Sequence, residues 1–467
     1  MTAPARVDPI TALTDDALLA PMLPGVHDGT WDAWLAVVKA LYALPMSDDE
    51  RATVRKLTGR EPPTEALRAA LALCGRRAGK TAISAALTLY ETALRDWEGF
   101  GSPGERIVGA MVAADKRQAS QALRYIRGGL EKSPLLSSLV ERELSESIEL
   151  NNGTEITVMT ASHRTIRGRS FAVLVADELC HWHQDGASPD AEVLRAAEPA
   201  LSLTDGLLLM ISTPHKRDGA AYRRWKRHHG KEGAPLLSVQ AESRVLNPNL
   251  SQSVVDEALA EDEAAARAEY LAEWRDDVAS FLPRPMIEAV VPDGVTERPK
   301  ESGVKYRAGV DVSGGANDSF TWAVAHTTDD GVDVLDMVRE VKPPFSPQAV
   351  VSQCARDLAR YGVREVKGDR YGAEWIREAF TRAGIRYITA EQNRSELYLD
   401  LLPRIAGQKA DLLDNERLVN QLCNLERRAR SNGPDSVDHP RAGADDVANA
   451  AAQALIWKKG TKRAGVF

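Results

Sequence analysis

The chain has 467 residues, 43% of them hydrophobic and 27% charged, and no apolar run approaches the ~20 residues needed to cross a bilayer, which argues against a membrane-spanning protein. Its formal net charge of -8 counts mildly against DNA binding, since Lys and Arg contact phosphates, although local basic stretches matter more than the total. Four cysteines without a CxxC pair argue against a zinc site or a disulfide scaffold, and the N-terminus lacks a signal-peptide core, so a reducing cytoplasm is expected.

Short apolar, β-rich runs alternate with helical patterns from about residue 65 to residue 240, as in a parallel α/β sheet. The expected strands are residues 66–74, 106–114, 171–177 and 206–213. An Ala- and Glu-rich helical stretch follows at 251–274, and residues 281–303 have the Pro, Gly and charge of a domain boundary. Since this length exceeds one core, we expect a flexible segment (1–30), a first domain (31–245), a helical linker (246–303) and a second domain.

The segment CGRRAGKT, residues 74–81, lies between an expected strand and an Ala-rich helix, where a phosphate-binding loop is found. Backbone N–H groups would hold the phosphates, Lys80 would reach the β and γ oxygens, and the Thr81 hydroxyl would hold Mg²⁺. The nucleotide-binding residues expected here are Gly75, Arg76, Arg77, Ala78, Gly79, Lys80 and Thr81. Cys74 replaces the usual first glycine, so the strict motif fails by one residue.

The strand FAVLVADE ends in Asp177 and Glu178, and adjacent carboxylates at the end of an apolar strand are costly unless they have a function. Asp177 would hold the water shell of Mg²⁺, and Glu178 would orient or deprotonate the attacking water. A third strand delivers Ser212 and Thr213, whose hydroxyls could sense a γ-phosphate. Because ligands bind at the carboxyl ends of strands in open α/β sheets, the three strand ends together predict ATP hydrolysis.

Arginines near the phosphates can neutralise transition-state charge. Arg76 and Arg77 lie inside the loop. Three more, Arg164, Arg167 and Arg169, precede the Asp177 strand and could reach a neighbouring subunit or DNA phosphate. These three are equally compatible with ordinary surface residues, and so are two basic stretches at residues 222–231 and 457–463.

Beyond residue 303 the order of expected elements changes. Strands at 306–314, 320–327 and 332–341 precede a helix at 347–362, a strand at 363–369, a helix at 372–384, a strand at 385–391, two helices, and a last helix at 445–459. The order βββαβα matches an RNase H-like domain, expected over residues 304–457, with a basic tail at 458–467.

Four aspartates in this half are metal-ligand candidates: Asp311 in an apolar strand, Asp369 at a strand end, and Asp445 and Asp446 at the start of the last helix. Converging carboxylates repel one another unless cations bind between them, and two Mg²⁺ or Mn²⁺ ions would support phosphodiester hydrolysis. Singly, Asp369 could cap a turn and Asp445 is a good helix N-cap. Asp318 could add a peripheral ligand, although a loop Asn-Asp favours a turn.

In this order the motifs resemble those of the large terminase subunit of tailed phages, over about Trp31 to Trp457. The matching segments are CGRRAGKT, VLVADE, ISTP, the helical stretch 247–274, GVD, GDRYG and HPRAGADD. The resemblance implies an α/β fold with an N-terminal P-loop (ASCE-type) ATPase domain, a helical linker and an RNase H-like nuclease domain. It assigns ATP hydrolysis to Lys80, Thr81, Asp177 and Glu178, coupling to Ser212 and Thr213, and nuclease metal binding to Asp311, Asp369 and one or both of Asp445 and Asp446.

The resemblance also implies that Arg76 responds to the γ-phosphate and that Trp31 or Trp34 contacts adenine, although no family glutamine accompanies these tryptophans. The chain has Ala444 where many relatives carry a histidine, which leaves open whether Asp445 or Asp446 binds metal.

The function implied is ATP-driven translocation of viral double-stranded DNA into a procapsid, with a two-metal endonuclease that cuts concatemeric DNA at the start and end of packaging. The cofactors are ATP, Mg²⁺ at the ATPase site, and two Mg²⁺ or Mn²⁺ at the nuclease site. The partners are viral DNA, the portal protein and procapsid, a small terminase subunit and further copies in a ring, commonly a pentamer, with no membrane. The expected location is the cytoplasm of the infected bacterial host, transiently at the portal vertex, and not the mature virion.

Three other functions remain open. A cellular helicase-nuclease or DNA repair ATPase would share both sites, but it usually adds a second ATPase-like domain, and the sequence has no second phosphate loop. A nucleotide-gated protein that remodels DNA without cutting it would lose no cleavage when Asp311 and Asp369 are replaced. A transposase would not need the ATPase domain.

Overall fold

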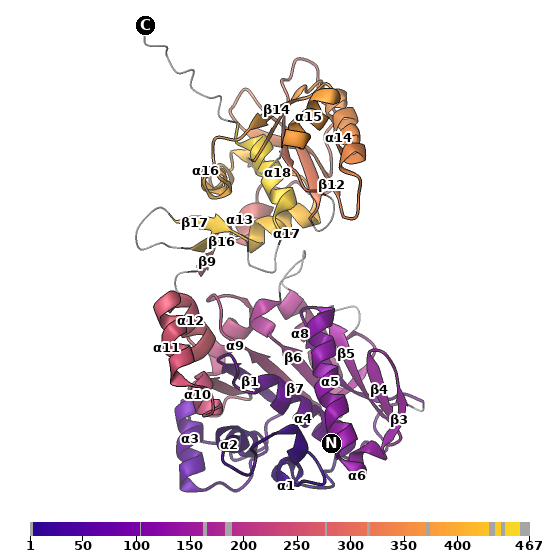
Figure 1. Ribbon diagram of the computed structural model, residues 1–467, viewed down its shortest axis with the longest axis vertical. Coiled ribbons are helices and arrows are strands. Elements are labelled where there is room, and N and C mark those ends of the chain that lie inside the picture. The colour runs from indigo at the N-terminus through magenta and orange to yellow at the C-terminus, as the bar shows by residue number, and fades with distance from the viewer. Residues whose placement is uncertain are drawn as a thin grey trace. The chain divides into compact units, whose positions relative to one another are not determined.

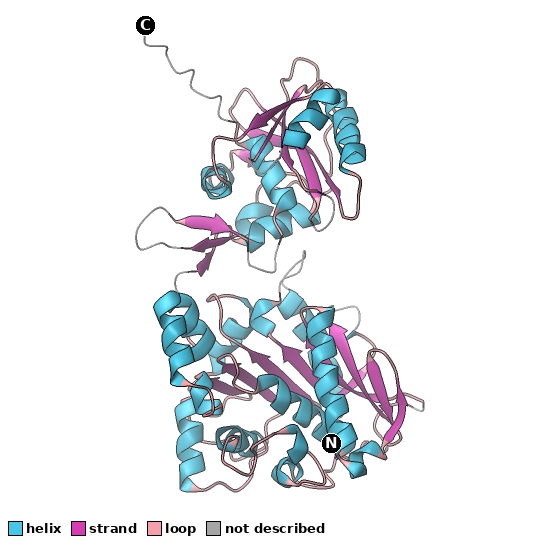
Figure 2. Ribbon diagram, viewed as in Figure 1, coloured by secondary structure: helices cyan, strands magenta, loops and turns pink. Residues whose placement is uncertain are grey.

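The computed structural model describes residues 3–102, 104–161, 166–182, 189–275, 278–314, 318–369, 374–428, 435–439 and 444–457. The chain divides into two compact units, one of residues 1–184 and 188–276, the other of residues 185–187 and 277–467. Each unit combines a sheet with helices (Figures 1 and 2), which confirms the predicted α/β class.

The first unit is built on an eight-stranded sheet. In spatial order its strands are β3 (Val140–Glu143), β4 (Ser147–Leu150), β5 (Thr154–Thr160), β2 (Ile107–Ala113), β6 (Ser170–Asp177), β7 (Leu207–Ser212), β1 (Ala69–Cys74) and β8 (Leu237–Ala241). Neighbours from β5 to β8 are parallel, whereas β3 and β4 form an antiparallel edge. The four predicted strands are β1, β2, β6 and β7, and the three that carry site residues, β6, β7 and β1, are adjacent.

Helices cover both faces of this sheet (Figure 1). They are α1 (Pro9–Thr14), η1 (Ala20–Met22), α2 (Asp32–Leu41), α3 (Asp48–Thr58), α4 (Lys80–Ala93), α5 (Lys116–Lys132), α6 (Pro134–Ser137), η2 (Leu179–His181), α8 (Pro189–Thr204), α9 (Gly219–His228), α10 (Ser243–Leu246), α11 (Gln252–Glu261) and α12 (Glu263–Leu271). Side chains of β1 alternate between two cores, as strand geometry requires. Ala70 and Ala72 belong to the core with α4, and Leu71 and Leu73 to the core with α8.

Residues 3–30 pack into the first unit, so the predicted flexible N-terminal segment is wrong. Asp8 caps α1 by accepting two backbone N–H groups. Leu13, Leu19 and Leu23 are completely buried in the core with α4. Their spacing follows neither a helical nor a strand period, because α1 and η1 are short and separated by turns, and this hid them from the sequence analysis.

The predicted separate linker, residues 246–303, is divided between the two units. Helices α11 and α12 contact one another, and α12 contacts α10, all within the first unit. The described residues from 278 onward belong to the second unit. The linker is therefore not a body of its own.

The second unit has a six-stranded sheet in the order β14 (Arg386–Thr389), β13 (Glu365–Gly368), β10 (Arg307–Asp311), β11 (Phe320–Thr327), β12 (Asp333–Val341), β15 (Ala410–Asp411). The meander β10–β11–β12 is antiparallel, and β13 and β14 run parallel to β10. This is the predicted succession of elements. A small antiparallel sheet joins β9 (Val278–Ser280), β16 (Glu426–Arg428) and β17 (Ser436–Asp438).

The helices of the second unit are α13 (Arg284–Glu288), α14 (Pro347–Tyr361), α15 (Glu374–Arg382), α16 (Arg394–Ala406), α17 (Glu416–Asn424) and α18 (Asp446–Leu455). Helix α18 lies directly on β10 and β11. Gly309 permits this approach, because a Cβ there would lie 2.4 Å from the Ala450 carbonyl oxygen. The packing fixes the start of α18, and with it Asp445 and Asp446. In the part of the chain described, no helix has the length and apolar character needed to span a membrane.

Candidate active sites

The phosphate loop, residues 75–79, joins β1 to α4. Gly79 and Arg77 both adopt left-handed conformations, with φ of 82° and 62°. Glycine does so freely, whereas a residue with a side chain needs its surroundings to hold it there. Gly75 has no room for a side chain, because a Cβ would lie 2.2 Å from Ser243 Oγ. Since α4 begins at Lys80, its unpaired first N–H groups lie at the end of the loop, where a helix binds phosphate.

Neighbouring elements hold the loop backbone. The N–H groups of the first two loop residues donate to main-chain carbonyls of β8 and α12: Gly75 to Ala241 (3.1 Å) and Arg76 to Glu269 (2.5 Å). The next three carbonyls accept from side chains: Arg76 from Ser243 Oγ (2.7 Å), Arg77 from Asn247 Nδ2 (2.8 Å) and Ala78 from Trp34 Nε1 (2.7 Å). The loop is therefore shaped by the protein itself.

The two tryptophans expected near adenine brace the loop. Trp34 is buried and bonds the Ala78 carbonyl. The ring of Trp31 lies against Gly79, where a Cβ would approach it to 2.8 Å, and its indole N–H donates to the Pro24 carbonyl at 2.9 Å. Both indole N–H groups are thus bound to backbone.

Lys80 is buried at the centre of the first site. Its Nζ donates to the carbonyls of Cys74 (3.1 Å) and Gly75 (3.2 Å) and to Thr213 Oγ1 (2.8 Å). Glu178 Oε1 lies 3.6 Å away. Thr81, the next residue of α4, is half-buried. The ammonium is therefore positioned between all three predicted strand ends.

Asp177, at the end of β6, has the features of a cation ligand. Burial raises the pKa of its carboxyl to about 7, and the neighbouring Glu178 adds to the rise, while Lys80 opposes it. Its Oδ1 is buried without a hydrogen-bond partner among the described residues. A buried carboxylate oxygen left unpaired is costly, so this oxygen fits a Mg²⁺ ion with its water shell.

Glu178 has the opposite electrostatic environment. Burial works to raise the pKa of its carboxyl, but Lys80 and hydrogen bonds at Oε2 outweigh burial and hold the pKa below its ordinary value. The bonds come from the Thr213 backbone N–H (3.1 Å) and Ser212 Oγ (3.4 Å). Glu178 is therefore ionised at neutral pH. Ser212 and Thr213 connect the end of β7 both to this carboxylate and, through the Thr213 hydroxyl, to Lys80.

The predicted arginines lie apart from Lys80. Arg76 pairs with Glu269 of α12 (2.9 Å), and its side chain is 60% exposed. Arg77 is exposed. Arg167 is exposed as well, and Arg169 lies 3.8 Å from Glu155. Arg164 lies outside the described residues.

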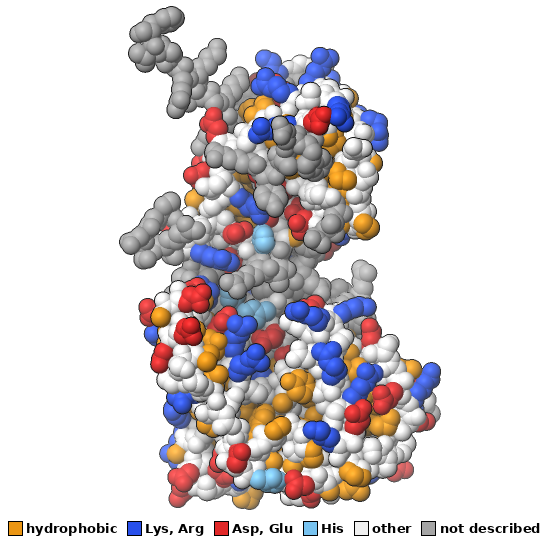
Figure 3. Space-filling view, in the orientation of Figure 1, with side chains coloured by type: hydrophobic (Ala, Val, Ile, Leu, Met, Phe, Trp, Pro, Cys, Tyr) orange, Lys and Arg blue, Asp and Glu red, His pale blue; other side chains and the backbone are white. Residues whose placement is uncertain are grey.

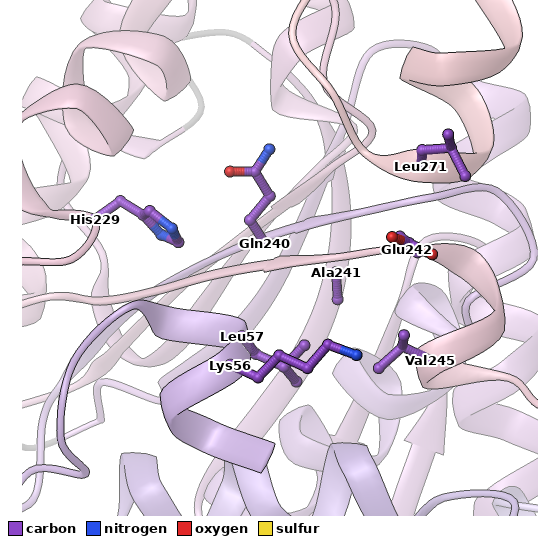
Figure 4. A pocket seen from close by; sticks show the side chains of 8 residues that line it. All are labelled: Lys56, Leu57, His229, Gln240, Ala241, Glu242, Val245 and Leu271. Atoms are coloured by element: carbon purple, nitrogen blue, oxygen red, sulfur yellow. The ribbon is translucent and has the colours of Figure 1, made fainter. Parts of the chain in front are cut away.

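A cavity of about 260 Å³ lies beside the loop's anchor on β8 (Figure 4). It is lined by side chains of α3, β8, α10 and α12 and of the segment between α9 and β8, namely Lys56, Leu57, His229, Gln240, Ala241, Glu242, Val245 and Leu271. It shares Ala241 with the bond that holds Gly75, but none of the predicted nucleotide-binding residues lines it.

In the second unit, Asp311 ends the central strand β10 and is buried. Burial raises the pKa of its carboxyl to about 8, Asp446 and Asp445 add to the rise, and the Asn449 hydrogen bond and Arg394 oppose it. Asn449 Nδ2 donates to Asp311 Oδ2 at 2.8 Å, while Asn449 Oδ1 is buried without a partner among the described residues. A carboxylate so deprived of water fits a cation ligand.

Asp369 follows β13, next to β10 in the sheet. Val310 is paired with Gly368 in this parallel register, so Asp311 and Asp369 are the next residues of the two strands. Tyr387 OH donates to the Asp369 carbonyl at 2.9 Å. Both carboxylates help to raise the pKa of the Tyr387 hydroxyl, after burial as the main cause. The strand ends therefore bring these two aspartates to one region.

Asp445 and Asp446 differ in their surroundings. Asp445 is buried and accepts from Tyr398 OH (2.7 Å) and Arg394 Nη1 (3.0 Å). It makes no side-chain cap of α18, so its N-cap alternative is wrong. Burial raises the pKa of Asp446 to about 6, with Asp445 and Asp318 adding to the rise.

Among the residues with described positions, no group of three or more His, Cys, Asp and Glu side chains is close enough to hold a metal ion. The structure brings the aspartates to one region of the second unit without closing them around a common centre. The donors fit divalent metal by their chemistry.

Some residues of these sites were missed by the sequence analysis. In the first site they are Ser243, Asn247 and Glu269, and in the second Arg394, Tyr398 and Asn449. Only Asn449 had a signal, because it lies three and four residues after Asp446 and Asp445 and so shares their helical face. The others lie on elements whose sequence carries no motif.

Basic side chains form no single patch on the face shown in Figure 3, where they alternate with acidic and apolar ones. The basic stretch 222–231 is partly a packing element, because the Trp225 ring stacks on Tyr222 and on His229. In the second stretch, residues 458–463 lie outside the described residues.

Residues 71–289 match the family model for the N-terminal part of the terminase large subunit, T4likevirus-type. No curated protein matches the chain. The chain is similar to the solved large terminase of HK97 bacteriophage, with 16% identity, coverage of 88% of this chain and 99% of that chain, and a TM-score of 0.37. It is also similar to the large terminase of a thermophilic bacteriophage in complex with ADP (14%; 88% and 98%; 0.39) and to the large terminase nuclease of thermophilic phage G20c with bound magnesium (16%; 36% and 95%; 0.31).

Proposed function

Because the chain belongs to the terminase large-subunit family, we propose that it is a DNA-packaging enzyme with two active sites. ATP hydrolysis in the first unit drives double-stranded viral DNA into a procapsid. A metal-dependent endonuclease in the second unit cuts concatemeric DNA at the start and end of packaging. The observation that carries the proposal is the adjacency of β6, β7 and β1, which brings Glu178, Thr213 and Lys80 into contact.

The residues of the first site divide the work of hydrolysis. The N–H groups of the loop and Lys80 bind the phosphates, whose oxygens replace two loop carbonyls around the ammonium. Thr81 and Asp177 hold Mg²⁺, which neutralises phosphate charge when bound with ATP. Glu178, kept ionised by Lys80, orients the attacking water and accepts its proton.

Ser212 and Thr213 couple the chemistry to movement in this proposal. Both residues bond Glu178, and Thr213 also bonds Lys80, so the end of β7 contacts a group that binds the γ-phosphate and a group that activates water. Loss of the γ-phosphate changes both sets of contacts at once. The end of β7 can therefore register whether ATP or ADP is bound.

In the second unit, Asp311 and Asp369 hold divalent metal together with the aspartates at the start of α18. Two Mg²⁺ or Mn²⁺ ions supply activation of water and stabilisation of the leaving oxygen in phosphodiester hydrolysis. Asn449 orients the Asp311 carboxylate, and Arg394 and Tyr398 fix Asp445. With Asp445 so engaged, Asp446 is the second metal-binding candidate at this helix start.

The partners proposed from the family are viral DNA, the portal and procapsid, a small terminase subunit and further copies of this chain in a ring, commonly of five. The proposed place of action is the cytoplasm of the infected host, at the portal vertex. A cellular repair or helicase-type ATPase-nuclease would show both activities as well, but it would not require a procapsid with a portal.

The nuclease half is tested by cleavage of supercoiled plasmid by the purified chain with Mn²⁺ or with EDTA, beside Asp311→Asn. We expect metal-dependent cutting that falls by at least roughly 10²-fold in the variant, because a buried metal ligand is neutralised. Asp330→Asn, an exposed residue of the turn between β11 and β12, is the matched control and should cut normally. A wild type that never cuts would leave the second unit without the proposed activity.

A further inference from the structure

The side chain of Arg76 is held by an element outside the phosphate loop. Its Nη1 lies 2.9 Å from Glu269 Oε2, on the last turns of α12. The side chain is 60% exposed, whereas Lys80, four residues later, is 7% exposed at the centre of the site. In this arrangement the guanidinium is not in the buried space around Lys80, where the phosphates of ATP are expected.

The loop backbone at Arg76 is fixed independently of that ion pair. The Arg76 N–H donates to the Glu269 carbonyl, and the Arg76 carbonyl accepts from Ser243 Oγ. Gly75 is packed against the Tyr270 carbonyl, which would lie 2.6 Å from an added Cβ. The side-chain pair can therefore open while the loop keeps its shape, and the carboxylate of Glu269 can be changed without removing the main-chain bond.

We propose that Glu269 is a positioning residue for Arg76: it holds the guanidinium on α12 until ATP binds, and then releases it to the γ-phosphate. The proposal rests on the ATPase function proposed above. The chemistry is an exchange of anions, because a guanidinium binds carboxylate and phosphate with the same planar set of donors. The nucleotide carries several negative charges, whereas Glu269 carries one.

The exchange is energetically easy because the pair is exposed. Both side chains are in contact with solvent, at 60% and 41%, so their attraction is weakened by water and salt. Such a pair favours one orientation without locking it. ATP binding must break it, and breaking it weakens apparent ATP affinity by the strength of the pair.

The test is a double-mutant cycle on nucleotide affinity in the full-length chain. Binding of a non-hydrolysable ATP analogue is measured for wild type, Glu269→Gln, Arg76→Ala and the double variant, together with KM and kcat for ATP. Glutamine keeps the size of the side chain and removes its charge. Glu263→Gln is the control, because Glu263 lies on the same helix in an exposed pair with Arg267.

We expect Glu269→Gln to bind the analogue roughly two- to fivefold more tightly, with a matching fall in KM and an unchanged kcat, as for the loss of an exposed ion pair. The gain should vanish in the Arg76→Ala background, and Glu263→Gln should bind as wild type does. Equal gains in both backgrounds, or no gain in either, would overturn the role of Glu269. A wild type that binds no ATP would overturn the ATPase function as well, which separates the two failures.

Discussion

At the scale of single residues, Asp177 and Glu178 show how adjacent carboxylates acquire different roles. Burial dominates at Asp177 and raises its pKa to about 7, whereas Lys80 dominates at Glu178 and keeps its pKa low. Environments that drive two pKa values apart separate a metal-holding group from a proton acceptor. Glu178 also has a left-handed backbone, with φ of 54°, which its contacts to Ser212 and Thr213 help to hold.

Replacing Glu178 tests this division of roles. Glu178→Gln should lower kcat for ATP by roughly 10²- to 10⁴-fold, the usual contribution of a general base, while ATP still binds because Lys80 and the loop remain. Steady-state turnover and equilibrium binding of ATP check the two parts. Glu257→Gln, exposed on α11, is the control. Loss of binding without loss of turnover per bound ATP would show that Glu178 has no part in the chemistry.

The residues that bear on ATP chemistry were predictable where a motif marks a strand end, as at Lys80 and Asp177. Their supporting residues were not. Trp34, for example, reaches the loop over 44 residues of sequence and Asn247 over 170, and no local pattern encodes contacts of that kind. Sequence reasoning therefore located the sites and missed what holds them in shape.

At the scale of elements, α4 is anchored at its far end by a buried charge. Glu91 is completely buried and contacts Arg68, Arg95 and Tyr42. Burial works to raise the pKa of Glu91, but the two arginines outweigh it and hold the pKa below its ordinary value. A lowered pKa contributes stability above the unfolded-state pKa, about 4.3, and this stability is lost as pH falls through the folded-state pKa.

Glu91→Gln should accordingly destabilise the first unit by about 3–5 kcal/mol at pH 7, as expected when one partner of a buried ion pair is removed. The difference from wild type should narrow below about pH 4. Urea unfolding at several pH values measures both effects. Glu98→Gln, an exposed residue nearby, should change neither. A difference that stays constant with pH would contradict an ionised Glu91.

Gly309 makes a similar prediction for α18. Gly309→Ala places a Cβ 2.4 Å from the Ala450 carbonyl and 2.5 Å from the Ala454 nitrogen, so the helix must shift. We expect a loss of about 1–3 kcal/mol, as for overpacking, and weaker DNA cleavage because Asp446 moves with the helix. Thermal unfolding and plasmid cleavage measure these effects. Gly128→Ala, a helical position with open space, should be neutral or stabilising, and an equally benign Gly309→Ala would refute the close packing.

Elements with strong periodicity were predicted well, among them β1, β6, β7 and the β10–β11–β12 meander. The short edge strands β3 and β4 and the N-terminal packing were not predicted. Their apolar residues, such as Leu19 and Leu23, follow no repeat because turns interrupt them. Tertiary burial, which sequence periods do not record, determines their structure.

At the scale of the whole molecule, the chain has two units, each with its own sheet and cores. Lys80 and Glu178 belong to one unit, and Asp311 and Asp369 to the other. The hydrogen bonds described for each site come from residues of its own unit. We therefore treat ATP hydrolysis and DNA cleavage as separate chemical activities of one chain.

The most direct test measures ATP turnover and plasmid cleavage in the same preparations of wild type, Glu178→Gln and Asp311→Asn. We expect wild type to have both activities, Glu178→Gln to lose turnover and still cut with Mn²⁺, and Asp311→Asn to lose cutting and still turn over ATP. Variants that lose both activities together while remaining folded, or a wild type with only one activity, would contradict the assignment of two active sites.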